Sequence, residues 1–233
     1  MGAIIKRELS AYFSSAIGYI FLAVYYVFSG FFFQATLASN TGNMSMIFGN
    51  MFTIILFLTP ILTMRLWSEE KKQKTDQALF TAPVKLLPVT LGKYFAALIV
   101  FVISLAINLV YAIVISAFTT PDWAVIMGNM LGLFLLGAAL IAIGMFISAL
   151  TENQVIAAVG GFGVAFFVML MDALPSFIPG DFFQKLITSI SFNGHYSDFS
   201  YGILKLTDVV FFLSVIVLFV FLTVRVFEKK RWS

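Results

Sequence analysis

The sequence predicts an all-α membrane protein with six transmembrane helices, in a single domain over residues 1–233. Hydrophobic residues make up 61% of the chain and charged residues only 11%, whereas a soluble domain carries roughly 25% charged residues. The mean hydropathy is +1.02, and the apolar residues gather in windows of the roughly 20 residues that a helix needs to cross a bilayer. The lack of cysteine excludes disulfides and thiolate metal sites.

Six apolar windows predict the six spans. They cover residues 16–37, 45–64, 94–118, 124–150, 155–171 and 209–226. The short TENQ segment between the fourth and fifth windows predicts a tight hairpin. An even number of spans places both chain termini on the same side of the membrane.

The basic residues predict which side that is, because short cytoplasmic loops of membrane proteins are enriched in Lys and Arg. Twelve of the 14 basic residues fall on the side of the termini, namely Lys6, Arg7, Arg65, Lys71, Lys72, Lys74, Lys85, Lys93, Arg225, Lys229, Lys230 and Arg231. Only Lys185 and Lys205 fall on the other side. We therefore expect both termini in the cytoplasm. The net charge of +3 then comes from the basic residues that set the topology, and it does not indicate a nucleic-acid partner. The same residues would attract anionic membrane lipids.

Residues 1–15 predict an amphipathic helix ahead of the first span. Ile5, Leu9, Tyr12 and Phe13 recur at helical spacing, and polar residues lie elsewhere around the helix. A helix of this kind lies in the interface between membrane and water. The alternative is that these residues are only the first turns of the first span.

The longest outer segment, residues 172–208, predicts a short amphipathic helix between the fifth and sixth spans. Asp181 is a favourable N-cap, and Asn193 with Gly194 is expected to end the helix. The apolar positions between them are Phe182, Phe183, Leu186, Ile187 and Ile190. We expect this helix at the outer mouth of the bundle, with Phe182, Phe183 and Leu186 as candidates for an outer gate.

Residues 65–93 form a charged cytoplasmic loop between the second and third spans. The i, i+4 spacing of Glu70 and Lys74 predicts that the second span continues as a helix into the cytoplasm. Thr75 or Asp76 is then able to cap a second, short helix.

This short helix, DQALF, is expected to end at Pro83. It places Leu79 and Phe80 on the wet side of the membrane. A loop that only fixes the topology accounts for the charges, but it gives these apolar side chains no role. An apolar face there predicts a docking surface for a cytoplasmic protein.

The loop resembles the cytoplasmic loop between the second and third spans of ABC-2 type ABC transporter permeases. In that family an R-x(3)-EE block is followed by a short helix, an (S/A)PV turn and LGK at the start of the next span. The matching positions are Arg65, Glu69, Glu70, Thr75, Leu79, Ala82, Pro83, Val84, Leu91, Gly92 and Lys93. The outer segment HYSDFSYGILKLTDVVFF is also similar to the segment before the last span, most of all in the gliding-motility-type branch. One departure is Lys74, where many relatives have Gly before the Thr.

The resemblance implies a permease subunit without catalytic activity of its own. Its loop would be a coupling helix that seats in a groove of a separate ABC ATPase subunit, and the residues implied in that contact are Arg65, Glu69, Glu70, Thr75, Leu79, Phe80 and Pro83. The ATPase would bind ATP and Mg²⁺, and this chain would bind no cofactor; indeed the sequence holds no GxxxxGK[ST] motif. A second permease copy or a sister permease would complete the substrate path in the cell membrane, which in a bacterium is the inner membrane.

Other functions find less support in the sequence. A membrane enzyme needs converging catalytic or metal-binding groups, and the chain has a single histidine, His195, in an outer loop, so we expect neither a catalytic nor a metal site. A secondary carrier uses ionisable groups inside its spans, and the apolar windows hold almost none. A non-transporting membrane anchor that recruits an ATPase stays open. Asn108 and Asn129 are the candidate polar groups of the interior, as interhelical hydrogen-bonders or as pore lining.

Overall fold

The computed structural model describes residues 1–39, 44–75, 85–118, 120–174, 184 and 188–232. Six helical stretches among these residues are long and apolar enough to cross a membrane, as the sequence predicts. They run over Ala16–Ala38, Ser45–Lys72, Leu86–Ser116, Trp123–Leu150, Gln154–Ala173 and Leu206–Lys230. The chain is a multi-span membrane protein.

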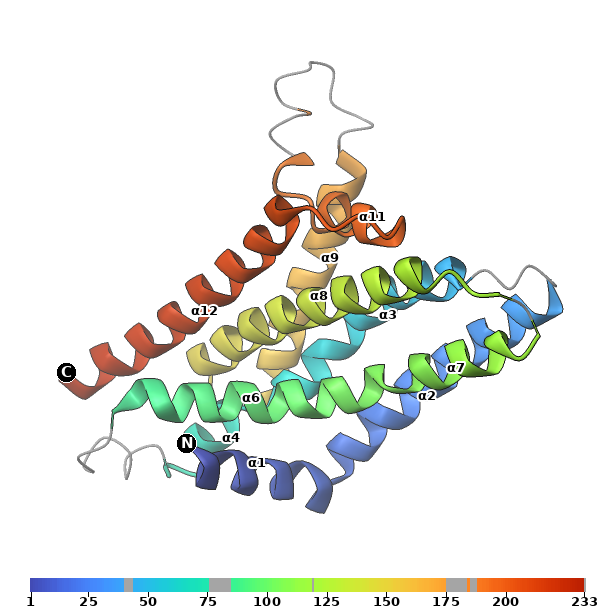
Figure 1. The fold of residues 1–233 in the computed structure, drawn as a ribbon. Coiled ribbons are helices and arrows are strands. Elements are labelled where there is room, and N and C mark those ends of the chain that lie inside the picture. Colours follow the sequence, from blue (N-terminus) through green and yellow to red (C-terminus); the bar gives the residue numbers. More distant parts are fainter. Residues whose placement is uncertain (40–43, 76–84, 119, 175–183, 185–187, 233) are drawn as a thin grey trace.

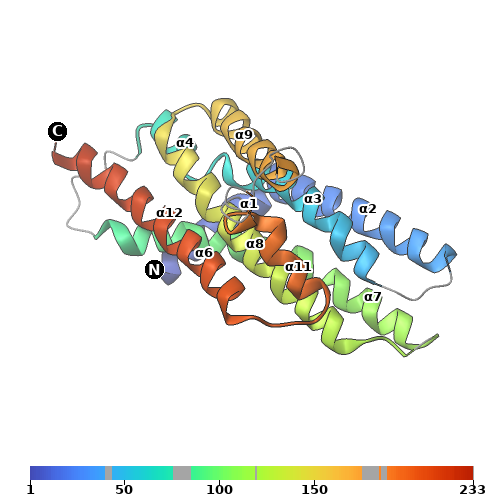
Figure 2. The same cartoon turned by 90° about the horizontal axis from the view of Figure 1, so that it is seen from above.

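The helices form one elongated bundle (Figures 1 and 2). In chain order they are α1 (Gly2–Ser14), α2 (Ala16–Ala38), α3 (Ser45–Thr63), α4 (Ser68–Lys72), α6 (Leu86–Leu105), α7 (Ile107–Ser116), α8 (Trp123–Leu150), α9 (Gln154–Ala173), α11 (Phe192–Ser200) and α12 (Leu206–Trp232). Both chain termini, α1 and α4 lie at one end of the bundle, at the left of Figure 1, which we call the termini end. The opposite end, which we call the far end, carries α11.

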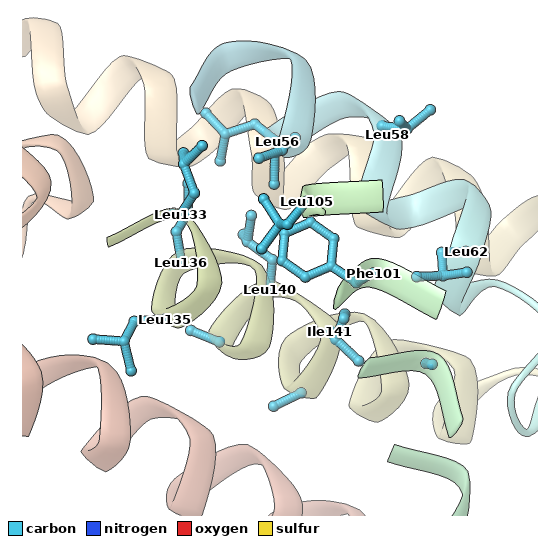
Figure 3. Close-up of a cluster of buried hydrophobic side chains, with 14 of the residues drawn as sticks. Leu56, Leu58, Leu62, Phe101, Leu105, Leu133, Leu135, Leu136, Leu140 and Ile141 are labelled. Carbon is cyan, nitrogen blue, oxygen red and sulfur yellow. The ribbon is translucent and has the colours of Figure 1, made fainter. Parts of the chain in front are cut away.

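The central helix of the bundle is α8, which packs against α3, α6, α9, α11 and α12. Its small residues allow these neighbours to approach closely. At Gly137, for example, an added Cβ would overlap the ring of Phe101 from α6. Figure 3 shows Phe101 and Leu105 lying among the leucines of α3 and α8. By contrast, α2, α9 and α12 expose large apolar side chains on their outer faces, as helices next to lipid do.

The third span differs from its prediction, which placed it at residues 94–118. It begins at Leu86 and is interrupted at Ala106, between α6 and α7. The earlier start is possible because Pro88 lies in the first turn, where a helix has no use for the backbone N–H that proline lacks. At the interruption, the hydroxyl of Tyr26 donates to the carbonyl of Ile103 at 3.1 Å. A side chain that bonds to a backbone carbonyl in this way is a recognised cause of a helix break.

Most of the short outer helix predicted between Asp181 and Asn193 lies outside the described residues, but its predicted end differs from the structure. Asn193 and Gly194 do not end a helix but lie in the first turn of α11, whose N-cap is Ser191. The Ser191 Oγ accepts a hydrogen bond from the N–H of Gly194 at 2.8 Å, which outweighs the helix-breaking tendency of the pair. The candidate gate residues Phe182, Phe183 and Leu186 lie outside the described residues.

Candidate functional site

The candidate site is the termini end of the bundle, where α1, α4 and α6 meet next to α8 and α12. The helix α1 lies directly against α6: a Cβ added to Gly92 would come within 2.8 Å of Ile4 Cγ2. This packing brings polar and charged side chains that are far apart in the sequence into contact. The helix predicted over residues 1–15 therefore forms as α1 and packs on the bundle, and its position at the membrane interface stays a prediction.

A side chain from another helix holds the start of α4. The Ser148 Oγ of α8 accepts hydrogen bonds from the N–H groups of Trp67 at 3.0 Å and Ser68 at 3.1 Å. A helix start leaves its first N–H groups without intrahelical partners, so Ser148 acts as an N-cap supplied by another helix. The ammonium of Lys71 donates to the carbonyl of Ala149 in the last turn of α8, where a cation also interacts favourably with the helix dipole.

Four side chains of alternating charge form what we call the ionic junction: Arg7, Glu8, Glu70 and Lys93. Lys93 Nζ lies 2.9 Å from Glu8 Oε1 and 3.0 Å from Glu70 Oε1. Arg7 Nη2 lies 2.6 Å from Glu8 Oε1 and also pairs with Glu70. The side chain of Lys93 is 1% exposed and that of Arg7 is 59% exposed. Lys93 is therefore the buried cation that both carboxylates share, and Arg7 covers the junction on the solvent side.

The electrostatics of the junction favour the charged forms of Glu8 and Arg7. Burial alone would raise the pKa of Glu8, but Lys93 and Arg7 together lower it below its ordinary value. The hydrogen bond to Glu8 is the main cause that raises the pKa of Arg7. Because two cations face two carboxylates, the charges of the junction cancel. Such a pairing is the condition under which buried charges are tolerated.

The ring of Trp67 lies beneath the junction. Lys93 Nζ is 5.0 Å from its centroid, and the ring packs at 4.1 Å on Phe227 of α12. Three buried polar atoms in this region have no hydrogen-bond partner among the described residues: Trp67 Nε1, Thr90 Oγ1 and Glu70 Oε2. Unpaired buried polar atoms are costly. The junction thus pairs its charges, while these three atoms have no hydrogen-bond partner among the described residues.

Arg65 forms a second polar link, between the end of the second span and α1. Its Nε lies 2.9 Å from Glu69 Oε2, and its Nη1 donates to Ser15 Oγ at 2.6 Å. Its guanidinium lies 5.4 Å from the ring centroid of Tyr12. The Tyr12 hydroxyl in turn donates to the carbonyl of Leu62 at 2.8 Å, one of the last carbonyls of α3, which the helix itself leaves without a donor.

The predicted helical continuation of the second span is correct only in part. The helix α3 ends at Thr63 and α4 follows after a turn. The predicted pair of Glu70 with Lys74 was wrong, because Lys74 has left the helix, with φ of 58°, and Glu70 pairs with Lys93 and Arg7 instead. The N–H of Thr75 donates to the carbonyl of Glu70 at 3.0 Å, as in a Schellman cap, whose left-handed residue is usually Gly.

Four of the seven coupling residues implied by the resemblance lie in the described part of the chain, namely Arg65, Glu69, Glu70 and Thr75. The other three, Leu79, Phe80 and Pro83, lie outside it. The carboxylate of Glu70 is 13% exposed and that of Glu69 is 31% exposed, and both bind cations of this chain. The structure therefore brings the R-x(3)-EE residues together to hold α4 in place, and their contact with a partner stays a prediction.

The two interior asparagines make interhelical hydrogen bonds and are fully buried. Asn108 Nδ2 donates to the Tyr25 hydroxyl at 2.9 Å. Asn129 Oδ1 accepts from the Tyr196 hydroxyl at 2.9 Å, and its Nδ2 donates to the carbonyl of Val125 at 2.8 Å. In this conformation both side chains serve helix packing.

Sequence reasoning did not identify Arg7, Glu8 and Lys93 as members of the site. A signal was present, because Glu8 is the only acidic residue before Glu69. Lys93 stands directly before an apolar window, where a lysine needs a partner or a route to water. Two opposite charges next to apolar windows on the same side of the membrane favour a pair. Only the packing of α1 on α6, however, shows that the pair forms.

No protein-family model matches this chain, and a comparison with curated proteins finds no significant match.

Proposed function

We propose that the chain is the permease subunit of an ATP-driven ABC-2 type exporter. In this proposal a separate ABC ATPase subunit binds ATP and Mg²⁺ and hydrolyses the nucleotide on the cytoplasmic side. The permease converts that work into movement of a substrate out of the cytoplasm or between the membrane leaflets. The chain itself is not catalytic and binds no cofactor.

The observation that carries the proposal is the ion pair between Glu70 and Lys93. These residues flank the loop that contains Leu79 and Phe80, so the pair joins the two ends of this loop at its base. The same Lys93 binds Glu8 of α1, and α4 is bonded to α8 through Ser148. A force applied to the loop would therefore reach α1, the third span and the fourth span directly, as a coupling element requires.

The backbone at Lys74 supports the proposed family. This is the position at which many ABC-2 type permeases have Gly, and Lys74 adopts the left-handed conformation that Gly occupies without strain. The residue type at position 74 therefore differs from that of many relatives, but its backbone conformation is the one that Gly would adopt there.

The charge distribution supports a cytoplasmic position for the termini end. Ten of its basic residues lie in described helices or caps there, whereas Lys205 is the far-end basic residue that the structure describes. Under the positive-inside rule, the proposed ATPase contact would lie on the cytoplasmic side of the cell membrane. A second permease copy or a sister permease would pack on the outer apolar faces of the bundle.

Purification of the complex from native membranes tests the proposal. We expect an ABC ATPase to co-purify with this chain, and its ATP hydrolysis to respond to the presence of the permease in vesicles. A stable permease preparation that carries no ATPase, and that leaves the hydrolysis rate of the ATPases in the same membranes unchanged, would contradict it. An ATPase that is recruited but drives no transport of any substrate would instead support the membrane anchor.

A further inference from the structure

A groove without polar lining opens between α9 and α12 along the surface of α8. Both helices pack on α8 but make little contact with each other. The groove has a volume of about 400 Å³, and apolar side chains alone line it. All three helices are among the candidate membrane spans, so the groove lies at the depth of the lipid hydrocarbon and opens sideways into it.

Aromatic contacts close the groove on several sides. Phe146 of α8 and Phe219 of α12 stack edge to face with centroids 5.6 Å apart and join the floor to one wall. At the far end, Phe192 lines the groove and packs edge to face on Phe211, with centroids 5.4 Å apart. The opposite wall is formed by α9, where Phe167 lines the groove. A flat helix face offers one side to a ligand, whereas this groove is lined by α8, α9 and α12 and, at its far end, by Phe192.

The size and the lining select the occupant. Water is excluded because it needs two or more polar partners, and apolar cavities stay dry. A cavity of roughly 150 Å³ already holds benzene, so this groove takes a longer apolar ligand. Protein interiors are packed with few voids larger than a water molecule, and the hydrocarbon around the groove supplies material of the right width to fill it.

We propose that this groove is a binding site for one acyl chain of a membrane phospholipid. Between apolar surfaces in a bilayer there is no hydrophobic driving force, so retention depends on van der Waals contact. A chain lined by α8, α9 and α12 makes more such contacts than a chain on an open helix face. The bound chain therefore exchanges more slowly than the other lipids around the protein. This inference needs no ATPase partner and stands apart from the proposed function.

Photo-cross-linking tests the site in the full-length protein. The protein is reconstituted in dioleoylphosphatidylcholine vesicles that contain a small fraction of phosphatidylcholine with a diazirine near the end of one acyl chain. After illumination, cross-linked peptides are quantified by mass spectrometry. We expect roughly fivefold or more label on the groove side of α9 and α12, relative to the exposed lipid-facing residues Val27 and Phe31 of α2.

Tryptophan substitutions that fill the groove should abolish the enrichment of label there. Val215→Trp on the α12 wall and Val164→Trp on the α9 wall should each reduce this enrichment to near the α2 level. The matched controls are Val217→Trp and Val159→Trp, on exposed faces of the same helices, and they should leave it unchanged. If one filling variant fails to fold, the variant on the opposite wall decides. Three outcomes would overturn the proposal. In the unmodified protein, the groove could be labelled equally with α2, or below the α2 level because a second copy covers it. In the variants, the enrichment could survive both filling substitutions.

Discussion

Lys93 Nζ lies 2.9 Å from Glu8 Oε1, although 85 residues separate the two in the chain. This pair fixes the amphipathic first helix to the beginning of the third span, and the same lysine holds Glu70 of α4 at 3.0 Å. One nearly buried ammonium group thus fastens three segments of the termini end. Lys93 therefore links α1, α4 and α6 through one side chain, beside the separate links that Arg65 and Ser148 make.

Lys93→Met should be the most damaging single change in the ionic junction. It keeps most of the side-chain volume but leaves Glu8 and Glu70 buried without their shared cation, and breaking a buried pair costs about 3–5 kcal/mol. Arg7→Ala should cost at most about 1 kcal/mol, because Arg7 is largely exposed. The measurement is the apparent melting temperature of each purified variant in detergent. Similar losses for both variants would show that burial does not distinguish the two cations.

The pH dependence of stability should show the contribution of Glu8. Its pKa is lowered in the folded protein, so the unfolded state binds a proton first as the pH falls. The contribution is therefore complete above the unfolded pKa near 4.5 and is lost as the pH falls through the lower folded value. The difference in melting temperature between the unmodified protein and Glu8→Gln should be constant near neutral pH and shrink below about pH 4.5. A difference that grows on acidification would contradict this sign.

Lys74→Gly should stabilise the end of α4. A left-handed conformation costs a residue other than Gly roughly 1–2 kcal/mol, and Gly loses part of this gain through the entropy of the unfolded chain. We expect a net gain of up to about 1 kcal/mol, seen as a higher melting temperature. The matched control is Lys72→Gly, which removes the same charge inside α4 and should cost about 1 kcal/mol. A loss at both positions would mean that the charge of Lys74, not its backbone, decides its effect.

The contrast between Lys74 and the spans shows which parts of the structure local sequence rules are able to predict. Each span needs about 20 apolar residues of its own, so composition alone locates it. The Glu70–Lys74 pair failed because helical spacing describes an isolated helix, whereas Glu70 gains two cations from α1 and α6 through tertiary packing. The same holds for Asn193 and Gly194, where the Ser191 cap overrides the usual meaning of the pair. The ionic junction needs three segments to be placed in space, and no local pattern encodes that placement.

Cysteine labelling should establish the orientation. Replacement of Gln73, at the end of α4, and of Ser197, in α11, places one thiol at each end of the bundle in a chain that has no other cysteine. A thiol reagent that does not cross membranes should label the cysteine at position 197 in intact cells and label that at position 73 only after the membrane is opened. Labelling in the reverse pattern would place the termini end outside the cell and remove the proposed site from the reach of ATP.

In the proposed function the coupling role of the loop rests on Leu79 and Phe80, so aspartate at either position should separate the ATPase from the permease. Apolar anchors in a small docking site are each worth roughly 1–3 kcal/mol, whereas a charge at the rim mainly changes the association rate and its salt dependence. Leu79→Asp or Phe80→Asp should therefore release the ATPase or uncouple ATP hydrolysis from transport, and Lys72→Ala should have little effect.

A loop that only fixes the topology predicts the opposite order, because it depends on the basic residues and gives the apolar pair no role. Pull-down of the ATPase with each permease variant distinguishes the two interpretations, provided that each variant still inserts in the membrane at its normal level. The Glu70–Lys93 pair makes this control realistic, since it joins the two segments that flank the loop and does not involve Leu79 or Phe80. If both aspartate variants retained the ATPase and coupled it fully, the coupling-helix assignment would be wrong, and the membrane anchor and the secondary carrier would be the remaining interpretations.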